Sequence, residues 1–112
     1  MAETPDFPLE VDVHWLSEKL DRKDDIFLLD VREGWERDIS VIRDSFAVPM
    51  SEVPERIDEL PKDKPIVVIC RVGGRSAQVT NWLRAQGFEN AINLSGGMNA
   101  WASEIDTKMS TY

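Results

Sequence analysis

The chain has 112 residues, with 13 Lys or Arg against 21 Asp or Glu, which gives a formal net charge of −8 at neutral pH. This length predicts a single domain with one core, and the acidic balance argues against nucleic acid as a partner, because phosphate contacts require Lys and Arg. No apolar run approaches the ~20 residues of a membrane helix, and the N-terminus lacks the basic and apolar regions of a secretory signal, so we expect a cytoplasmic protein without membrane association.

The first third of the chain predicts a strand, a helix and a second strand. Residues 1–9 hold two prolines among polar residues, and we expect them to form a flexible lead-in. Alternation of polar and apolar residues predicts a short strand over 10–13, and two leucines four residues apart predict a helix over 14–20. The continuous apolar run 26–29 ends at Asp30 and is typical of a strand that is buried on both faces of a parallel sheet.

The middle of the chain is less regular. We predict a short helical turn over 33–38 and a weak strand over 45–48, which a proline ends. A helix is expected after that strand, with Ser51 as its N-cap. Its apolar stripe would consist of Val53, Ile57 and Leu60, at positions i, i+4 and i+7.

The strongest strand signal lies at residues 66–69, four consecutive β-branched residues that end directly before Cys70. A helix is predicted over 76–86, with Ser76 as its N-cap. Gly87 follows at the position after the C-cap, where glycine is favoured.

Residues 91–94 predict a last strand and 98–103 a last helix, so we expect one domain over 10–104 and a C-terminal tail over 105–112. Strands that alternate with helices at this spacing favour an α/β fold in which helices cover both faces of a parallel sheet. In such open sheets, ligands bind outside the carboxyl ends of the strands. Cys70 follows a predicted strand and is therefore expected at that edge.

The loop that begins with Cys70 has six residues, ends at Arg75 and precedes a helix. Gly73 and Gly74 let it curl tightly, since glycine accepts positive φ at little steric cost, and a curled loop can turn its amides inward as an anion-binding nest. The positive end of the following helix and the side chains of Arg71 and Arg75 also favour a thiolate. Because the thiolate is the nucleophilic form, the loop predicts a reactive cysteine and a site for an anionic substrate.

The alternative interpretation is an ordinary turn between strand and helix, with Cys70 as a small buried residue at the end of the strand. It leaves two arginines beside a cysteine at the ligand-binding edge unexplained. A Cys–His catalytic pair is not expected, because His14, the only histidine, lies at the start of the first predicted helix. As the only cysteine, Cys70 excludes an internal disulfide and a multi-cysteine metal site, which fits a reducing compartment.

The segment from Cys70 to Ala77, with the sequence CRVGGRSA, resembles the active-site loop of rhodanese-family sulfurtransferases. Further motifs resemble that family in the same order: LLDVRE at 28–33 with the WE that follows, the approach to the catalytic strand at 61–68, and the pairs NL, GG and AW between 93 and 101. The resemblance extends from about residue 10 to residue 101. It implies a three-layer α/β/α fold with a mainly parallel five-stranded sheet.

The resemblance also implies a thiosulfate sulfurtransferase that works by double displacement. The Cys70 thiolate would attack the sulfane sulfur of thiosulfate or a related donor, sulfite would leave, and Cys70 would carry a persulfide. Cyanide, a small thiol or a partner protein would then take the outer sulfur. The implied substrate-binding residues are Arg71, Val72, Gly73, Gly74, Arg75 and Ser76. Their amides would cradle the persulfide and the two arginines would position the donor, and no metal or organic cofactor is implied.

Other functions remain open at this point. One is a sulfur-carrier module whose acceptor is another protein, and the other is a non-catalytic interaction domain, against which the intact cysteine and loop arginines argue. Phosphatase activity is disfavoured, because the loops of the related phosphatases are one residue longer between cysteine and arginine. The shorter loop from Cys70 to Arg75 closes around a single sulfur atom more readily than around a tetrahedral oxyanion.

Two features leave substrate recognition open. The chain departs from the family at Ser40–Ser45, where the family's histidine is replaced by Val41 and its proline by Arg43. We expect this stretch to support the site structurally, although it leaves the preferred substrate undecided. Trp35 is the one tryptophan that we expect near the mouth of the site, and the other three are expected in the core or at its rim.

Asp30 and Arg32 end the second predicted strand and are expected on the same side of the sheet as Cys70, where they would support the loop. In one interpretation Asp30 orients the loop through Arg75 or the loop amides. In the other, which we favour, it belongs to a capping and turn network. Arg32 and Glu36 are four residues apart, and this spacing predicts an ion pair on a helical turn.

Overall fold

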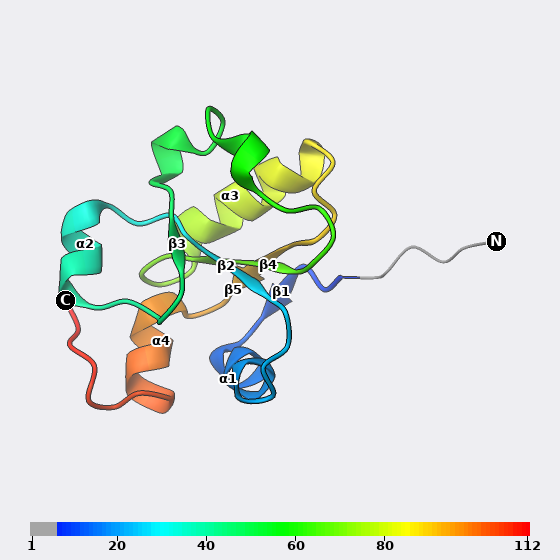
Figure 1. Cartoon of the computed structure of the whole chain (residues 1–112). Coiled ribbons are helices and arrows are strands. Elements are labelled where there is room, and N and C mark those ends of the chain that lie inside the picture. The colour runs from blue at the N-terminus through cyan, green and yellow to red at the C-terminus, as the bar shows by residue number, and fades with distance from the viewer. Residues whose placement is uncertain (1–6) are drawn as a thin grey trace.

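The computed structural model describes residues 7–112, which form helices around a five-stranded sheet (Figure 1). Every strand pairs in parallel with its neighbours, in the order β1-β5-β4-β2-β3. The strands are β1 (Glu10–Val11), β2 (Phe27–Asp30), β3 (Phe46–Ala47), β4 (Ile66–Ile69) and β5 (Ala91–Leu94). The predicted α/β fold with a parallel sheet is confirmed. Residues 1–6 of the expected lead-in lie outside the described residues.

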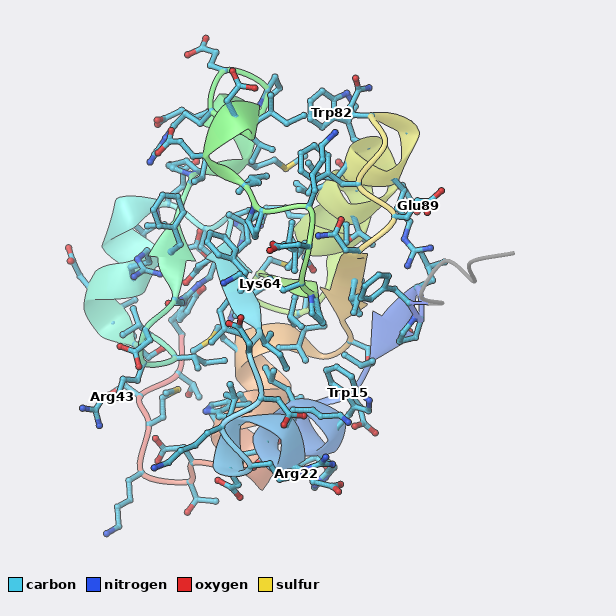
Figure 2. The ribbon with its side chains drawn as sticks, turned by 45° about the vertical axis from the view of Figure 1, so that its right-hand side comes forward. Trp15, Arg22, Arg43, Lys64, Trp82 and Glu89 are labelled. Carbon is cyan, nitrogen blue, oxygen red and sulfur yellow. The ribbon has the colours of Figure 1, made fainter. Side chains whose placement is uncertain are left out.

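Helices cover both faces of the sheet. They are α1 (Val13–Asp21), α2 (Gly34–Ile39), α3 (Gly74–Ala85) and α4 (Gly97–Glu104), with the 3-10 helices η1 (Met50–Glu52) and η2 (Ile57–Glu59). α1 and α4 lie on one face and α3 on the other (Figure 1). In Figure 2, Trp82 marks the layer on the side of α3, and Trp15 marks the layer on the side of α1. Among residues 7–112, no helix combines the length and the apolar character needed to cross a membrane.

Strand β4 lies at the centre of the sheet, between β2 and β5. Its first and third residues belong to the core beneath α3, and its second and fourth to the core against α1 and α4, as the alternation along a strand requires. All of them are 0% exposed, a position that suits a run of β-branched residues. The register aligns Ile69 with Asp30. β4 and β2 therefore end at the same edge of the sheet, and Cys70 is the next residue along the chain.

The prediction of a helix that begins at Ser51 is wrong. The segment instead forms the two short 3-10 helices η1 and η2, with turns between them. Pro54 has no amide hydrogen and cannot donate to the Met50 carbonyl, which the Val53 amide reaches instead at 3.3 Å. The prediction that apolar side chains of this segment face the core is confirmed in part, because Val53 and Leu60 are buried beneath α3.

Candidate functional site

The loop between β4 and α3 wraps around the sulfur of Cys70. Gly73 has a φ of +108° and is the N-cap of α3, so the helix begins at Gly74 and the prediction that Ser76 caps it is wrong. This left-handed conformation is favourable only for glycine. It brings the Gly73 amide to 3.0 Å from Cys70 Sγ, and the first helical turn brings Ser76 Oγ to 3.2 Å. The cysteine is 1% exposed.

The surroundings of Cys70 favour its ionised form. Burial raises the pKa of the thiol, but hydrogen bonds together lower it by more than burial raises it. The pKa of Cys70 therefore lies below its ordinary value. The contacts that lower it are first the one with the Ser76 hydroxyl, in which either atom can be the donor, and then those from the backbone amides of Ser76, Gly73 and Val72. Amides that point at one sulfur from a curled loop and a helix N-terminus stabilise negative charge there. The loop thus forms a nest of inward amides, and these amides act on the sulfur together with the Ser76 hydroxyl.

The guanidinium of Arg75 does not point freely into the site. It donates two parallel hydrogen bonds to the Glu36 carboxylate of α2, at 2.6 and 2.7 Å. The Glu36 side chain is 3% exposed, and the Arg75 guanidinium lowers the pKa of this carboxyl to about 2. The predicted ion pair between Arg32 and Glu36 is wrong, because Glu36 is committed to Arg75. Arg32 reaches only the Glu36 backbone carbonyl, at 3.4 Å.

Asp30 and Arg32 form a buried pair at the end of β2. Arg32 Nε and Nη2 donate to the two Asp30 oxygens at 3.0 and 2.8 Å, and Arg37 Nη1 donates to the same carboxylate at 2.7 Å. The Arg32 backbone amide adds a fourth contact at 3.0 Å. Asp30 therefore belongs to a turn network, as favoured above. None of the hydrogen bonds described for it reaches Arg75 or the loop amides.

The turn before α4 locks the loop from the other side. The first amides of a helix have no acceptor within the helix. In α4, the Met98 and Asn99 amides donate instead to the carbonyls of Cys70 and Arg71, both at 2.9 Å. Gly97 has a φ of +52°, and a Cβ on it would lie 2.3 Å from the Cys70 carbonyl oxygen. Only glycine fits this close approach. The glycine pair was visible in the sequence, but its contact with the loop could be found only from the fold.

A family model for the rhodanese-like domain matches residues 12–104. The chain belongs to the rhodanese-like family. It is 40% identical over 93 residues to a sulfurtransferase of Allochromatium vinosum, a match that covers 83% of this chain and 87% of that protein. It is 38% identical over 99 residues to YtwF of Bacillus subtilis, covering 88% of this chain and 95% of that protein. With the buried cysteine, this makes the chain a sulfurtransferase of the rhodanese family.

The rhodanese-like fold is also shown by solved structures. The crystal structure of a rhodanese-like domain protein from Staphylococcus aureus superimposes with a TM-score of 0.80 at 28% identity, over 92% of this chain and 97% of that one. The three-layer arrangement with a five-stranded sheet, expected from the resemblance, is therefore confirmed. In this chain every strand of that sheet is parallel.

The segment Ser40–Ser45, where the chain departs from the rhodanese pattern, holds the arginines that bind Asp30. The Ser40 carbonyl accepts from Arg32 Nη2 at 2.7 Å, and Ser45 Oγ accepts from Arg37 Nη1 at 3.1 Å. These contacts are structural, and they keep α2 next to the end of β2.

The last residue of the chain lies beside α2 (Figure 1), although residues 105–112 were expected to be a tail outside the domain. Tyr112 Oη donates to Glu36 Oε2 at 2.5 Å, and Arg71 stacks on the tyrosine ring with its guanidinium 4.7 Å from the centroid. Arg71 Nη2 also donates to the Tyr112 carbonyl. Trp35, 60% exposed, meets the same ring edge-on at 5.7 Å. Tyr112 thus links Arg71 to Glu36, the partner of Arg75. No periodicity in the sequence indicated this role for Tyr112.

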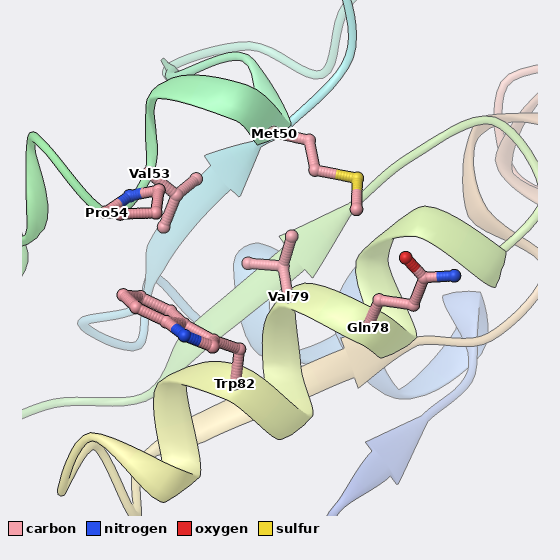
Figure 3. A pocket seen from close by; sticks show the side chains of 6 residues that line it. All are labelled: Met50, Val53, Pro54, Gln78, Val79 and Trp82. Atoms are coloured by element: carbon pink, nitrogen blue, oxygen red, sulfur yellow. The ribbon is translucent and has the colours of Figure 1, made fainter.

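Two other features of the described residues lie apart from this loop. His14 Nε2 pairs with Glu104 Oε1 at 2.9 Å on an exposed surface, so the structure forms no Cys–His pair. An apolar pocket of about 320 Å³ lies between η1 and α3 (Figure 3). It is lined by Met50, Val53, Pro54, Gln78, Val79 and Trp82. Because this lining contains no ionisable side chain, the pocket does not supply the chemistry of a thiolate site.

Proposed function

We propose that the chain transfers sulfane sulfur from thiosulfate or a related anionic donor to a thiophilic acceptor, through a persulfide on Cys70. The observation that carries this proposal is the cradle around Cys70 Sγ. A buried thiol with a lowered pKa, met by the Gly73 amide at 3.0 Å, stands at the N-terminus of a 12-residue helix. Such a site holds negative charge on sulfur without a metal or an organic cofactor.

The first half-reaction starts from the Cys70 thiolate. It attacks the outer sulfur of thiosulfate, a new S–S bond forms, and the bond inside thiosulfate breaks. The electron pair of that bond leaves with sulfite. Cys70 then carries a persulfide, whose charge lies on the outer sulfur and is held by the inward amides of Val72, Gly73 and Ser76, and by Gly74 at the first position of the helix.

The second half-reaction restores the thiolate. A nucleophilic acceptor such as cyanide, a small thiol or a protein cysteine attacks the outer sulfur, and the persulfide S–S bond breaks. The electron pair returns to Cys70 Sγ, so no oxidant or reductant is consumed. Because the chain has no other cysteine, the acceptor comes from outside it.

The two loop arginines have different roles in this proposal. Arg75 is bound by Glu36 and holds the loop against α2, so it contributes a partly neutralised charge. The Arg71 side chain is exposed and, among the hydrogen bonds and stacking contacts of the described residues, contacts only Tyr112. This leaves its guanidinium able to bind an anionic donor. Asp30 and Arg32 support both indirectly, by holding the start of α2.

A protein acceptor is the second candidate for the outgoing step. Val72 of the loop is 58% exposed, and Trp35 beside Tyr112 is 60% exposed. Large apolar side chains exposed around a reactive centre are typical of protein interaction surfaces. The donor step and the loop chemistry are the same in both cases.

The proposal is tested by measuring sulfur transfer from thiosulfate and from other sulfane donors, with cyanide and with thiols as acceptors. We expect transfer from at least one of these donors to fall by at least ~10³-fold in Cys70→Ser, because the nucleophile is lost. Transfer at an unchanged rate in Cys70→Ser would show that the sulfur takes another route. Comparing acceptors at saturating donor separates a small-molecule acceptor from a protein one.

A further inference from the structure

Asn93 lies behind Cys70, in β5, and neither the proposed reaction nor the resemblance assigns it a role. It is 4% exposed and lies in register with Glu10 of β1. Its Oδ1 accepts a hydrogen bond from Ser76 Oγ at 2.5 Å, and its Nδ2 donates to Glu10 Oε2 at 2.9 Å and to the Gly73 carbonyl at 3.4 Å. A continuous chain of contacts therefore runs from Cys70 through Ser76 and Asn93 to Glu10.

The neighbours of Asn93 decide which way its amide faces. The Glu10 carboxylate and the Gly73 carbonyl can only accept hydrogen bonds, so the NH₂ group of Asn93 must face them. Its carbonyl oxygen then faces Ser76 and can only accept. The Ser76 hydroxyl has one proton, and this arrangement directs that proton to Asn93 and a lone pair toward Cys70.

The direction of the Ser76 proton couples Asn93 to the charge on sulfur. When Cys70 is a thiol, its S–H donates to Ser76 Oγ, and every group in the chain is satisfied. When Cys70 is a thiolate, the sulfur can only accept. The hydroxyl then either rotates toward the sulfur and leaves Asn93 Oδ1 without its donor, or stays with Asn93 and turns a lone pair toward the negative sulfur, which is also unfavourable. A buried acceptor that loses its partner carries a free-energy cost. The same cost is absent in the persulfide, where the charge lies on the outer sulfur and Ser76 can again donate to Asn93.

We propose that Asn93 is a positioning residue that sets the reactivity of Cys70 by competing for the Ser76 hydroxyl proton, and thereby favours the persulfide over the free thiolate. The part that concerns the persulfide rests on the proposed function. The part that concerns the free thiolate does not, and it is measured without any sulfur donor.

Other charged groups also act on Cys70 and must stay constant between variants. Arg75, paired with Glu36, lies close enough to interact electrostatically with the sulfur, and Arg71 is the next residue in the chain. Glu10 reaches the site only through Asn93. From α4, the residues that meet the loop are Gly97, Met98 and Asn99, which carry no charge. Substitutions at positions 76 and 93 leave all of these charged residues unchanged. Asn93→Leu also removes the hydrogen bond to Glu10, but it does so with and without the Ser76 hydroxyl, so a comparison of the two backgrounds accounts for that loss.

The test measures the rate at which iodoacetamide alkylates Cys70 across pH, in the full chain. We expect Asn93→Leu, which is close in size and has no polar group, to free Ser76 to donate to the thiolate. At a fixed pH below the midpoint of the wild-type rate profile, the alkylation rate then rises about threefold to tenfold. This change corresponds to the net free energy of one hydrogen bond. Asn93→Val, a β-branched alternative suited to a strand, is expected to give the same direction and serves where the leucine variant does not fold.

The matched control is the same substitution in a Ser76→Ala background. With the hydroxyl gone, Asn93→Leu is expected to leave the alkylation profile unchanged, because Asn93 acts only through Ser76. An equal rise in both backgrounds, or slower alkylation in Asn93→Leu alone, would overturn the proposal. A merely structural role for Asn93 would lower stability without this dependence on Ser76.

The persulfide arm uses intact mass at fixed ratios of thiosulfate to sulfite. We expect Asn93→Leu to shift the balance from persulfide toward thiolate by the same threefold to tenfold. If the wild type forms no persulfide, the proposed function fails while the alkylation result still stands. If the wild type forms it and Asn93→Leu does not alter the balance, the proposed role of Asn93 fails instead.

Discussion

Replacing Glu36 by Gln tests the link between α2 and the loop. The carboxylate is nearly fully buried, accepts two hydrogen bonds from Arg75 and one from Tyr112, and has its pKa lowered from 4.5 to about 2. A pKa difference of this size between folded and unfolded states corresponds to about 3 kcal/mol of stability at neutral pH. We therefore expect Glu36→Gln to unfold with about 3 kcal/mol less free energy at pH 7.

The sign of the pH dependence follows from the lowered pKa. The contribution of Glu36 is fully present above the unfolded pKa, and it is lost as the pH falls toward the folded value of about 2. The gap between wild type and Glu36→Gln should therefore hold from pH 7 to about pH 5 and shrink to roughly half by pH 3. Urea unfolding at a series of pH values measures this gap.

The control is Glu55→Gln, which removes the same charge from an exposed residue. It should leave stability within about 0.5 kcal/mol at every pH, as is usual for surface substitutions. A Glu36→Gln gap that is as large at pH 3 as at pH 7, or one no larger than that of Glu55→Gln, would refute the account of the pair between Glu36 and Arg75.

Three further substitutions test the contacts that hold the site. Gly97→Ala should lower the free energy of unfolding by at least about 2 kcal/mol, since it adds a clash with backbone to a left-handed conformation. Gly34→Ala, where a Cβ meets nothing, should cost nothing, and equal effects at both positions would contradict this reasoning. Asp30→Asn should cost about 3 kcal/mol, because it leaves two arginines without their carboxylate; a loss below about 0.5 kcal/mol in urea unfolding would argue against a buried ion network. Tyr112→Phe should cost about 1 kcal/mol through the lost hydrogen bond to Glu36, and an unchanged urea midpoint would count against that contact.

Local patterns predicted the elements that the core defines. Residues 66–69 and 91–94 match β4 and β5, because short, mainly apolar segments are typical of strands that are buried on both faces of a parallel sheet. Gly87 ends α3 with a φ of +97°, as its place after the helix suggested. The position of Cys70 at the carboxyl edge followed from the same strand pattern and the general rule for open sheets.

The partners of the charged side chains could not be predicted in the same way. Arg75 and Glu36 are separated by 39 residues, and only the packing of α2 beside the loop brings them together. The expected pair of Arg32 and Glu36 relied on helical spacing, but Arg32 precedes α2 and turns back to Asp30. Such contacts between distant segments have no local signature.

The start of α3 shows a second limit. Serine is a residue type favoured at the N-cap, yet Gly73 and not Ser76 is the N-cap of α3. The left-handed conformation of Gly73 closes the loop on the sulfur. The serine is then free to face Cys70 and Asn93. Position in the loop, and not residue preference, decides its role.

The most direct test of the account is the intact mass of the protein after incubation with thiosulfate, for wild type and Cys70→Ser. The account predicts that the wild type alone becomes heavier by one sulfur atom and that cyanide removes it. An equal gain in Cys70→Ser, or no gain in the wild type with thiosulfate or any other sulfane donor, would contradict a persulfide on Cys70.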